Sequence, residues 1–167
     1  ISVSAFLLNR SSDLSLVSYS ALASTVGIDA KTVETYIDLL EKSYVIFRLR
    51  SFSRNMRNEL KHSKKIYFCD NGVRNALISA FSPMEIRMDT GALWENFVIS
   101  ERVKRNEYAK HWCNSYFWRT REQKEIDYLE EYDGVLHAYE FKYNARKQAV
   151  IPKNFATAYP GATFLKL

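Results

Sequence analysis

The sequence lacks the residues and segments on which several classes of protein depend. It contains two cysteines, Cys69 and Cys113, which form neither a CxxC motif nor a cluster with histidine. We therefore expect reduced thiols in a cytoplasmic protein, not disulfides or zinc ligands. No apolar run approaches the roughly 20 residues of a membrane span and no signal peptide is present, so no membrane partner is expected. The chain also has no GxxxxGK[ST] motif, which excludes ATP binding by that route.

The composition is that of a folded globular protein. Of the 167 residues, 47% are hydrophobic, 14% aromatic and 26% charged, which is enough apolar material for the cores of one or two small domains. The net charge of +5 and the pI of about 9.1 permit a polyanionic partner such as DNA. The chain starts at Ile1 instead of Met and ends on an apolar run, so we expect it to be a piece of a longer protein.

Residues 1–88 show the pattern of a helical domain that contains a winged helix-turn-helix. Gly27 supplies the turn between two short helices, Ser18 or Ser20 can cap the first of them, and Asp29 is placed to cap the second. Two β-prone segments follow and predict the ribbon of the wing. The predicted elements are helices over 1–9, 18–25, 29–42 and 73–80 and strands over 44–49 and 65–68.

The helix-turn-helix and the wing of this predicted domain differ in charge. The second helix carries more acidic than basic side chains, so phosphates would repel it, and we favour its packing against a neighbouring domain. The wing is basic, with Glu59 as its one opposing acid, and could contact a phosphate backbone; a solvated, flexible loop is the alternative. The candidate nucleic-acid-binding residues are Arg48, Arg50, Arg54, Arg57, Lys61, Lys64 and Lys65.

Residues 89–167 form the second predicted domain, which follows a linker over 81–89. Its first helix carries a predicted buried stripe that includes Leu93 and Phe97. Three aromatic and β-branched segments then predict strands, of which the last two are joined at Asp133-Gly134, a strong hairpin signal. The predicted order is α-β-β-β-α-β, with helices over 91–108 and 153–158 and strands over 116–121, 125–131, 135–143 and 162–167.

Charged residues in two of these strands predict a metal site. Because side chains alternate along a strand, Glu140 and Lys142 share one face, and a suitable register would bring Asp127 to the same face. The two carboxylates and the backbone carbonyl of Phe141 are hard oxygen ligands that suit Mg²⁺ or Mn²⁺. The alternative is a solvated salt bridge between strands. Glu95 is either a charge favoured by its helix dipole or a third carboxylate of the site.

Several segments of the sequence resemble segments of known protein families. The order of elements, with an acid in the first helix, Asp in the second strand and Glu-x-Lys in the third, resembles the core of the PD-(D/E)XK nucleases. The phrases NGVRNAL after KIYFCD, GALWENFV, YFWRTREQKEIDYL and YEFKYN look like the C-terminal region of a prokaryotic AAA-type ATPase family. The resemblance implies an α+β or α/β fold in which a winged helix precedes a restriction-endonuclease-like domain. It also implies an ATPase core elsewhere in the full-length chain, and ATP would bind only to that core.

The resemblance also assigns a role to individual residues. Glu95 matches the acid of the helix and Asp127 the central metal-binding aspartate. Glu140 and Lys142 match the (D/E)-x-K pair, with Lys142 and Glu95 in catalytic roles, and Phe141 would lend its carbonyl to the metal. One departure is that the residue before Asp127 is not proline.

These observations leave two main hypotheses for function. The first is divalent-metal-dependent hydrolysis of DNA phosphodiesters by the second domain. The alternative is a catalytically inactive accessory module of the ATPase that binds nucleic acid or protein, since nuclease-like folds also serve as binding modules. A transcription regulator that reads DNA through the helix-turn-helix is a third interpretation, which the acidic second helix disfavours.

Overall fold

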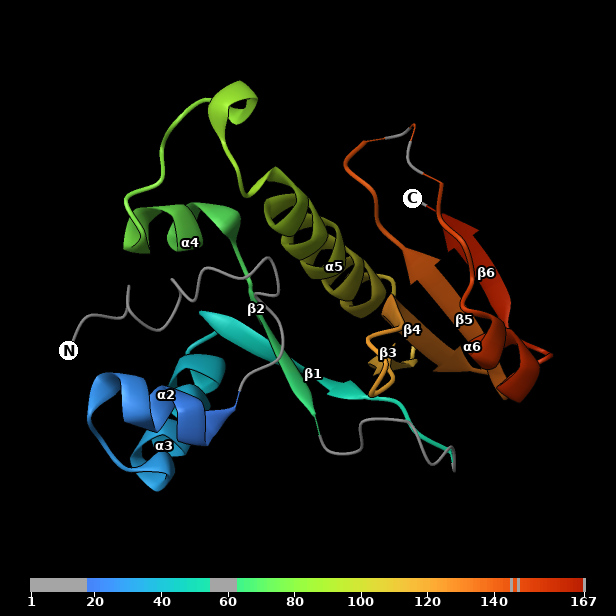
Figure 1. Ribbon diagram of the computed structural model, residues 1–167, viewed down its shortest axis with the longest axis horizontal. Helices are drawn as coiled ribbons and strands as arrows, with labels where there is room; N and C mark the ends of the chain where they lie inside the picture. The colour runs from blue at the N-terminus through green and yellow to red at the C-terminus, as the bar shows by residue number, and fades with distance from the viewer. Residues whose placement is uncertain (1–17, 55–62, 145, 147, 167) are drawn as a thin grey trace.

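The computed structural model describes residues 18–54, 63–144, 146 and 148–166. The fold is mixed α/β, built on one six-stranded sheet of order β2-β1-β3-β4-β5-β6 (Figure 1). The pairs β1–β3 and β5–β6 are parallel, and the other neighbours are antiparallel. Within the described ranges, no helix combines the length and the apolar character needed to cross a membrane. The helix predicted over 1–9 and the candidate residues Arg57 and Lys61 lie outside these ranges.

The helices and strands follow the predicted order closely. The helices are α2 (Tyr19–Val26), α3 (Ala30–Lys42), α4 (Asn71–Leu77), α5 (Thr90–Tyr108) and α6 (Lys153–Ala158), with a 3-10 turn, η1 (Met84–Ile86), in the predicted linker. The strands are β1 (Ile46–Ser51), β2 (Lys64–Phe68), β3 (Asn114–Arg119), β4 (Glu125–Tyr132), β5 (Val135–Glu140) and β6 (Thr163–Lys166). The order α-β-β-β-α-β predicted for the second half is therefore confirmed.

Local capping signals determine the first two helices. The side chain of Ser18 accepts the backbone N–H of Ala21 and that of Asp29 accepts the N–H of Thr32, so each satisfies one of the free donors at a helix start. Gly27 ends α2 in the left-handed conformation, with φ 73°, which glycine adopts without steric cost. The predicted turn and the cap at Asp29 are confirmed, and Ser18 is the one of the two candidates that caps α2.

The strands predicted as a wing belong to the same sheet as the second half of the chain. Antiparallel β1 and β2 pack against α2 and α3 at one end of the molecule, and α6 lies beside β5 and β6 (Figure 1). β1 also pairs in parallel with β3, through Arg50 with Tyr116 and Ser51 with Phe117. The sheet is thus continuous across residue 88, the predicted boundary between domains.

The two faces of the sheet are covered by different helices. On one face, α5 packs through Ile99 against aromatic residues of four strands and of the segment after β5. On the other, Phe155 of α6 packs against Trp118 and its neighbours. The core under α5 contains Leu49, Tyr67, Phe117, Tyr128, Tyr139 and Phe141, and the core under α6 contains Phe52, Trp118, Ile126, Leu129, Leu136 and Ala138.

A bulge in β4 changes the alternation of side chains near Asp127. Tyr116 of β3 pairs with Leu129, but Trp118, two residues later, pairs with Ile126, three residues earlier. β4 therefore contains one extra residue at this point. Ile126 and Leu129 consequently both lie in the core under α6, which regular alternation would not allow.

Polar contacts fix α5 to the edge strand β2. The side chain of Asn96 accepts the N–H of Phe68 at 2.8 Å and donates to its carbonyl at 3.0 Å, as a neighbouring strand would. Asn96 is 5% exposed, so these bonds satisfy groups that water does not reach. The predicted buried stripe of α5 is wrong at Phe97, which is 46% exposed, whereas Ile99 is fully buried.

Candidate metal centre

Asp127 lies at the centre of a cluster of acidic residues under α5. Its side chain is 8% exposed, and its Oδ2 accepts the backbone N–H of Phe141 at 2.9 Å. Carboxylate oxygens of Asp127, Glu95 and Glu125 all lie within 4.8 Å of one another. Burial first, and then the charges of Glu95 and Glu140, raise the pKa of Asp127 to about 7.

Glu95 enters this cluster from the N-terminal part of α5. Its Oε1 accepts the hydroxyl of Tyr67 at 2.7 Å and the ammonium of Lys65 at 3.2 Å. Burial, together with the neighbouring Glu95 carboxylate, raises the pKa of Tyr67 and keeps its phenol protonated as a donor. Of the two alternatives left open for Glu95, its position corresponds to the third carboxylate.

Glu125 is the member of the cluster that sequence reasoning missed. It begins β4, and its two oxygens have different partners: Oε1 pairs with Lys65, and Oε2 with Arg119 at 3.1 Å. Glu125 and Asp127 are two residues apart in a strand, so both side chains can lie on one face. That spacing was a usable signal, although Glu-x-Asp alone is common.

Glu140 and Lys142 adjoin the cluster at the end of β5. The two side chains form an ion pair. Burial would lower the pKa of Lys142, but its bond to Glu140 and the charges of Asp127 and Glu95 raise it. β5 ends at Glu140, so the predicted strand to 143 is too long and Lys142 follows the strand. The side-chain carboxylate of Glu140 is not one of the three within 4.8 Å of one another.

The prediction that Lys65 contacts a phosphate backbone needs correction. Its side chain is 1% exposed and is directed to the α5 side of β2, where its ammonium pairs with Glu95 and Glu125 and lies 5.4 Å from the ring centre of Phe117. Burial would lower the pKa of Lys65, but the carboxylates, Asp127 included, outweigh it and raise the pKa. A side chain so placed has no access to DNA.

The other candidate nucleic-acid-binding residues divide into two groups. Arg48 pairs with Asp38 and Glu41 of α3, and Arg54 pairs with Glu131, so their charges are neutralised within the chain. The remaining described candidates, Arg50 and Lys64, have no carboxylate partner in the described part of the chain; Lys64 lies over the ring of Tyr19 at 5.3 Å.

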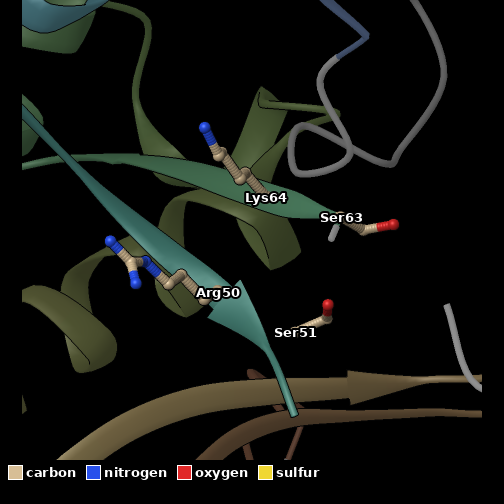
Figure 2. A pocket seen from close by; sticks show the side chains of 4 residues that line it. All are labelled: Arg50, Ser51, Ser63 and Lys64. Carbon is tan, nitrogen blue, oxygen red and sulfur yellow. The ribbon is translucent and has the colours of Figure 1, made fainter. Parts of the chain in front are cut away.

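Arg50 and Lys64 line a small hollow with two serines. They are directly paired across β1 and β2, and Ser51 and Ser63 complete a cavity of about 230 Å³. Figure 2 shows both basic side chains extending from neighbouring strands, with the serine hydroxyls farther along the ribbon. Like charges directly opposite each other are unfavourable unless an anion is near. Because side chains alternate, Arg50 and Lys64 point to the face of the ribbon opposite to Lys65.

A second group of possible metal ligands contains a carboxylate that stabilises the fold. His111, Cys113 and Glu130 also come within 4.8 Å of one another. Glu130, however, is fully buried and accepts bonds from Arg102 at 2.8 and 2.6 Å. It also accepts from the amide of Asn106 and from the hydroxyl of Tyr139. The charge of this carboxylate is already neutralised, so Glu130 belongs to a structural ion-pair network.

The chemistry of the first cluster fits a hard divalent cation. Three carboxylates offer the oxygen ligands that Mg²⁺ and Mn²⁺ prefer. The raised pKa of Asp127 reflects like charges held close in a buried place, a situation that a divalent cation relieves. The N–H of Phe141 bonds to Asp127, and the role of its carbonyl as a ligand stays a prediction.

Two family models match successive parts of the chain. Residues 3–84 match the model of a domain of unknown function, DUF8612, and residues 90–165 match that of a domain of unknown function, DUF4143. Two curated relatives are the uncharacterized proteins Mb2031c of Mycobacterium bovis and Rv2008c of Mycobacterium tuberculosis, each 28% identical over 130 residues. These alignments cover 76% of this chain and 28% of each relative, so the chain spans less than a third of their length. No solved structure matches significantly.

Proposed function

We propose that this chain is the C-terminal part of an AAA-type ATPase, in which a winged helix is followed by a PD-(D/E)XK-like domain that hydrolyses DNA phosphodiesters with a divalent metal. The observation that carries this proposal is the meeting of Glu95, Glu125 and Asp127, with oxygens within 4.8 Å, beside the Glu140–Lys142 pair. The position of the second region also supports it, since the DUF4143 domain is commonly C-terminal to AAA ATPases.

Each residue of the cluster has a role that follows from its surroundings. Asp127, Glu95 and Glu125 would hold the metal, and Glu140 would adjoin it. A bound Mg²⁺ or Mn²⁺ would lower the pKa of a coordinated water and offset charge on the phosphodiester. Lys142, held protonated by Glu140, would orient the attacking water or stabilise the charge that develops on the phosphate.

Cleavage of labelled DNA tests this proposal. Wild type, Asp127→Asn and Lys142→Met are compared in Mg²⁺ and in Mn²⁺, with Asp133→Asn as a control because Asp133 lies exposed in the β4–β5 turn. We expect wild type and Asp133→Asn to cleave equally, and the other two variants to lose at least a hundredfold in rate, as is typical when a charged catalytic group is removed. Equal background cleavage in all four proteins would refute the catalytic role.

The second candidate function is a metal-free accessory module, and one observation favours it. Lys65, Arg119 and Lys142 already oppose the carboxylates of the cluster, so most of its negative charge is neutralised within the chain. Titration calorimetry with Mg²⁺ and Mn²⁺ distinguishes the two functions. Measurable binding that Asp127→Asn abolishes supports the enzyme, and absence of binding supports the module.

DNA remains the proposed partner, and Arg50 with Lys64 are the proposed contacts. What supports this is the lack of carboxylate partners for both cations among the described residues, together with the hollow between them. Since the side chains of Arg50 and Lys64 lie on the face of the ribbon opposite to Lys65 and the acidic cluster, one phosphate cannot contact both. A duplex would pass around the edge strand β2, with different phosphates at the two places.

A further inference from the structure

We infer that Lys65 is a built-in counter-cation that competes with the divalent metal for the acidic cluster and so limits metal loading. This inference rests on the proposed function, because it concerns regulation of the same site. Lys65 comes from β2, in the region that matches DUF8612, whereas Glu95, Glu125 and Asp127 come from the region that matches DUF4143. One region thus supplies the cation that neutralises the acids of the other.

The ion pairs and hydrogen bonds of the cluster show why the two cations compete. Each oxygen of Glu125 already pairs with a cation, Oε1 with Lys65 and Oε2 with Arg119. Oε1 of Glu95 accepts from Lys65 and from Tyr67. A metal held by all three carboxylates would therefore share Glu125 with Lys65 or take it from Lys65, and in either case it would stand close to a protonated ammonium. Two cations at such short range repel each other strongly in a buried site.

The burial of Lys65 makes this competition costly for the metal. At 1% exposure, the ammonium cannot turn to water while β2 keeps its place, and an unpaired buried charge is strongly unfavourable. β2 is held by β1 and by the bonds of Asn96 to Phe68. Full loading of the cluster is then expected when the β1–β2 ribbon shifts, or when Lys65 is removed.

Substitution of Lys65 tests the inference directly. Mn²⁺ binding is measured by titration calorimetry for wild type, Lys65→Met and Lys153→Met. Methionine keeps the apolar stem without the charge, and Lys153→Met is the matched control because it removes the same charge at an exposed position of α6. We expect Lys65→Met to bind Mn²⁺ at least tenfold more tightly than wild type, and Lys153→Met to bind as wild type does.

The outcomes separate this inference from the proposed function. Equal or weaker binding by Lys65→Met overturns the role of Lys65 and leaves the metal site standing. Absence of binding in all three proteins overturns the metal site itself, and the inference with it. Thermal unfolding gives a second readout: we expect Lys65→Met to melt below wild type in EDTA and to gain more from Mn²⁺ than wild type does.

A measurement on wild type keeps the test independent of whether Lys65→Met folds. The ¹⁵Nζ resonance of Lys65 is followed by NMR during titration with Mg²⁺, with that of the exposed Lys153 as reference. We expect Mg²⁺ to shift the Lys65 signal and to leave the Lys153 signal in place. Mg²⁺ binding that leaves the Lys65 resonance unchanged would overturn the inference.

Discussion

Replacement of Asp127 by asparagine is expected to stabilise the metal-free protein at pH 8. Burial and neighbouring carboxylates raise the pKa of Asp127 from 3.8 to about 7. Since one pKa unit corresponds to about 1.4 kcal/mol, ionisation costs the folded protein about 4 kcal/mol. Asparagine avoids this cost and keeps an oxygen that can accept the N–H of Phe141. Burial of its amide group is itself unfavourable by about 1–2 kcal/mol. The net gain is about 2–3 kcal/mol.

The sign of the pH dependence follows from the direction of this shift. The pKa of Asp127 is higher in the folded than in the unfolded protein, so its contribution to stability is complete below about pH 4 and is lost as the pH rises to about 7. The advantage of Asp127→Asn over wild type should therefore grow between these two values and stay constant above them.

Urea unfolding in EDTA between pH 5 and pH 8 measures this difference. Asp133→Asn is the matched control, because Asp133 is exposed and its left-handed conformation, with φ 51°, suits asparagine equally well. We expect no change in its pH dependence. If Asp127→Asn is less stable than wild type at pH 8, or if their difference does not vary with pH, the proposed crowding of negative charge around Asp127 is wrong.

Three further predictions concern the network under β4, the anchor of β2 and the basic hollow. Arg102→Met would leave the fully buried carboxylate of Glu130 without its cation and cost about 3–5 kcal/mol of unfolding free energy in urea. Asn96→Ala would leave two backbone groups of β2 unsatisfied and cost about 2–4 kcal/mol in the same assay. The double variant Arg50→Ala, Lys64→Ala should weaken DNA binding and reduce its salt slope by about 2, measured by fluorescence anisotropy; an unchanged slope would exclude both contacts.

The elements that sequence reasoning located well are those fixed by local chemistry. The caps at Ser18 and Asp29 lie next to the helices that they start, and Asp133-Gly134 makes the predicted two-residue hairpin turn with both residues at positive φ. Such signals act within four residues, so they need no knowledge of the tertiary fold. The helix over 153–158 was predicted with the bounds that the structure has.

The features that sequence reasoning missed depend on contacts between distant segments. The basic run from Arg48 to Lys65 suggested a single surface, but strand alternation sends Lys65 into the core and Arg50 to the opposite face. The bulge in β4 arises from its pairing with β3 and has no local signature. Glu125 lies in the cluster with two cationic partners from distant segments: Arg119 comes from β3, which pairs with β4, and Lys65 comes from β2.

The placement of Lys65 bears on how the two regions of the chain depend on each other. Without it, the second region would hold several carboxylates at close range in a buried place, an arrangement that folds poorly unless a cation is present. With Lys65 in place, the cluster is neutralised in part without metal. The net charge of the cluster then depends on a strand of the first region. Any motion of the first region that moves β2 would then alter the charge of the cluster.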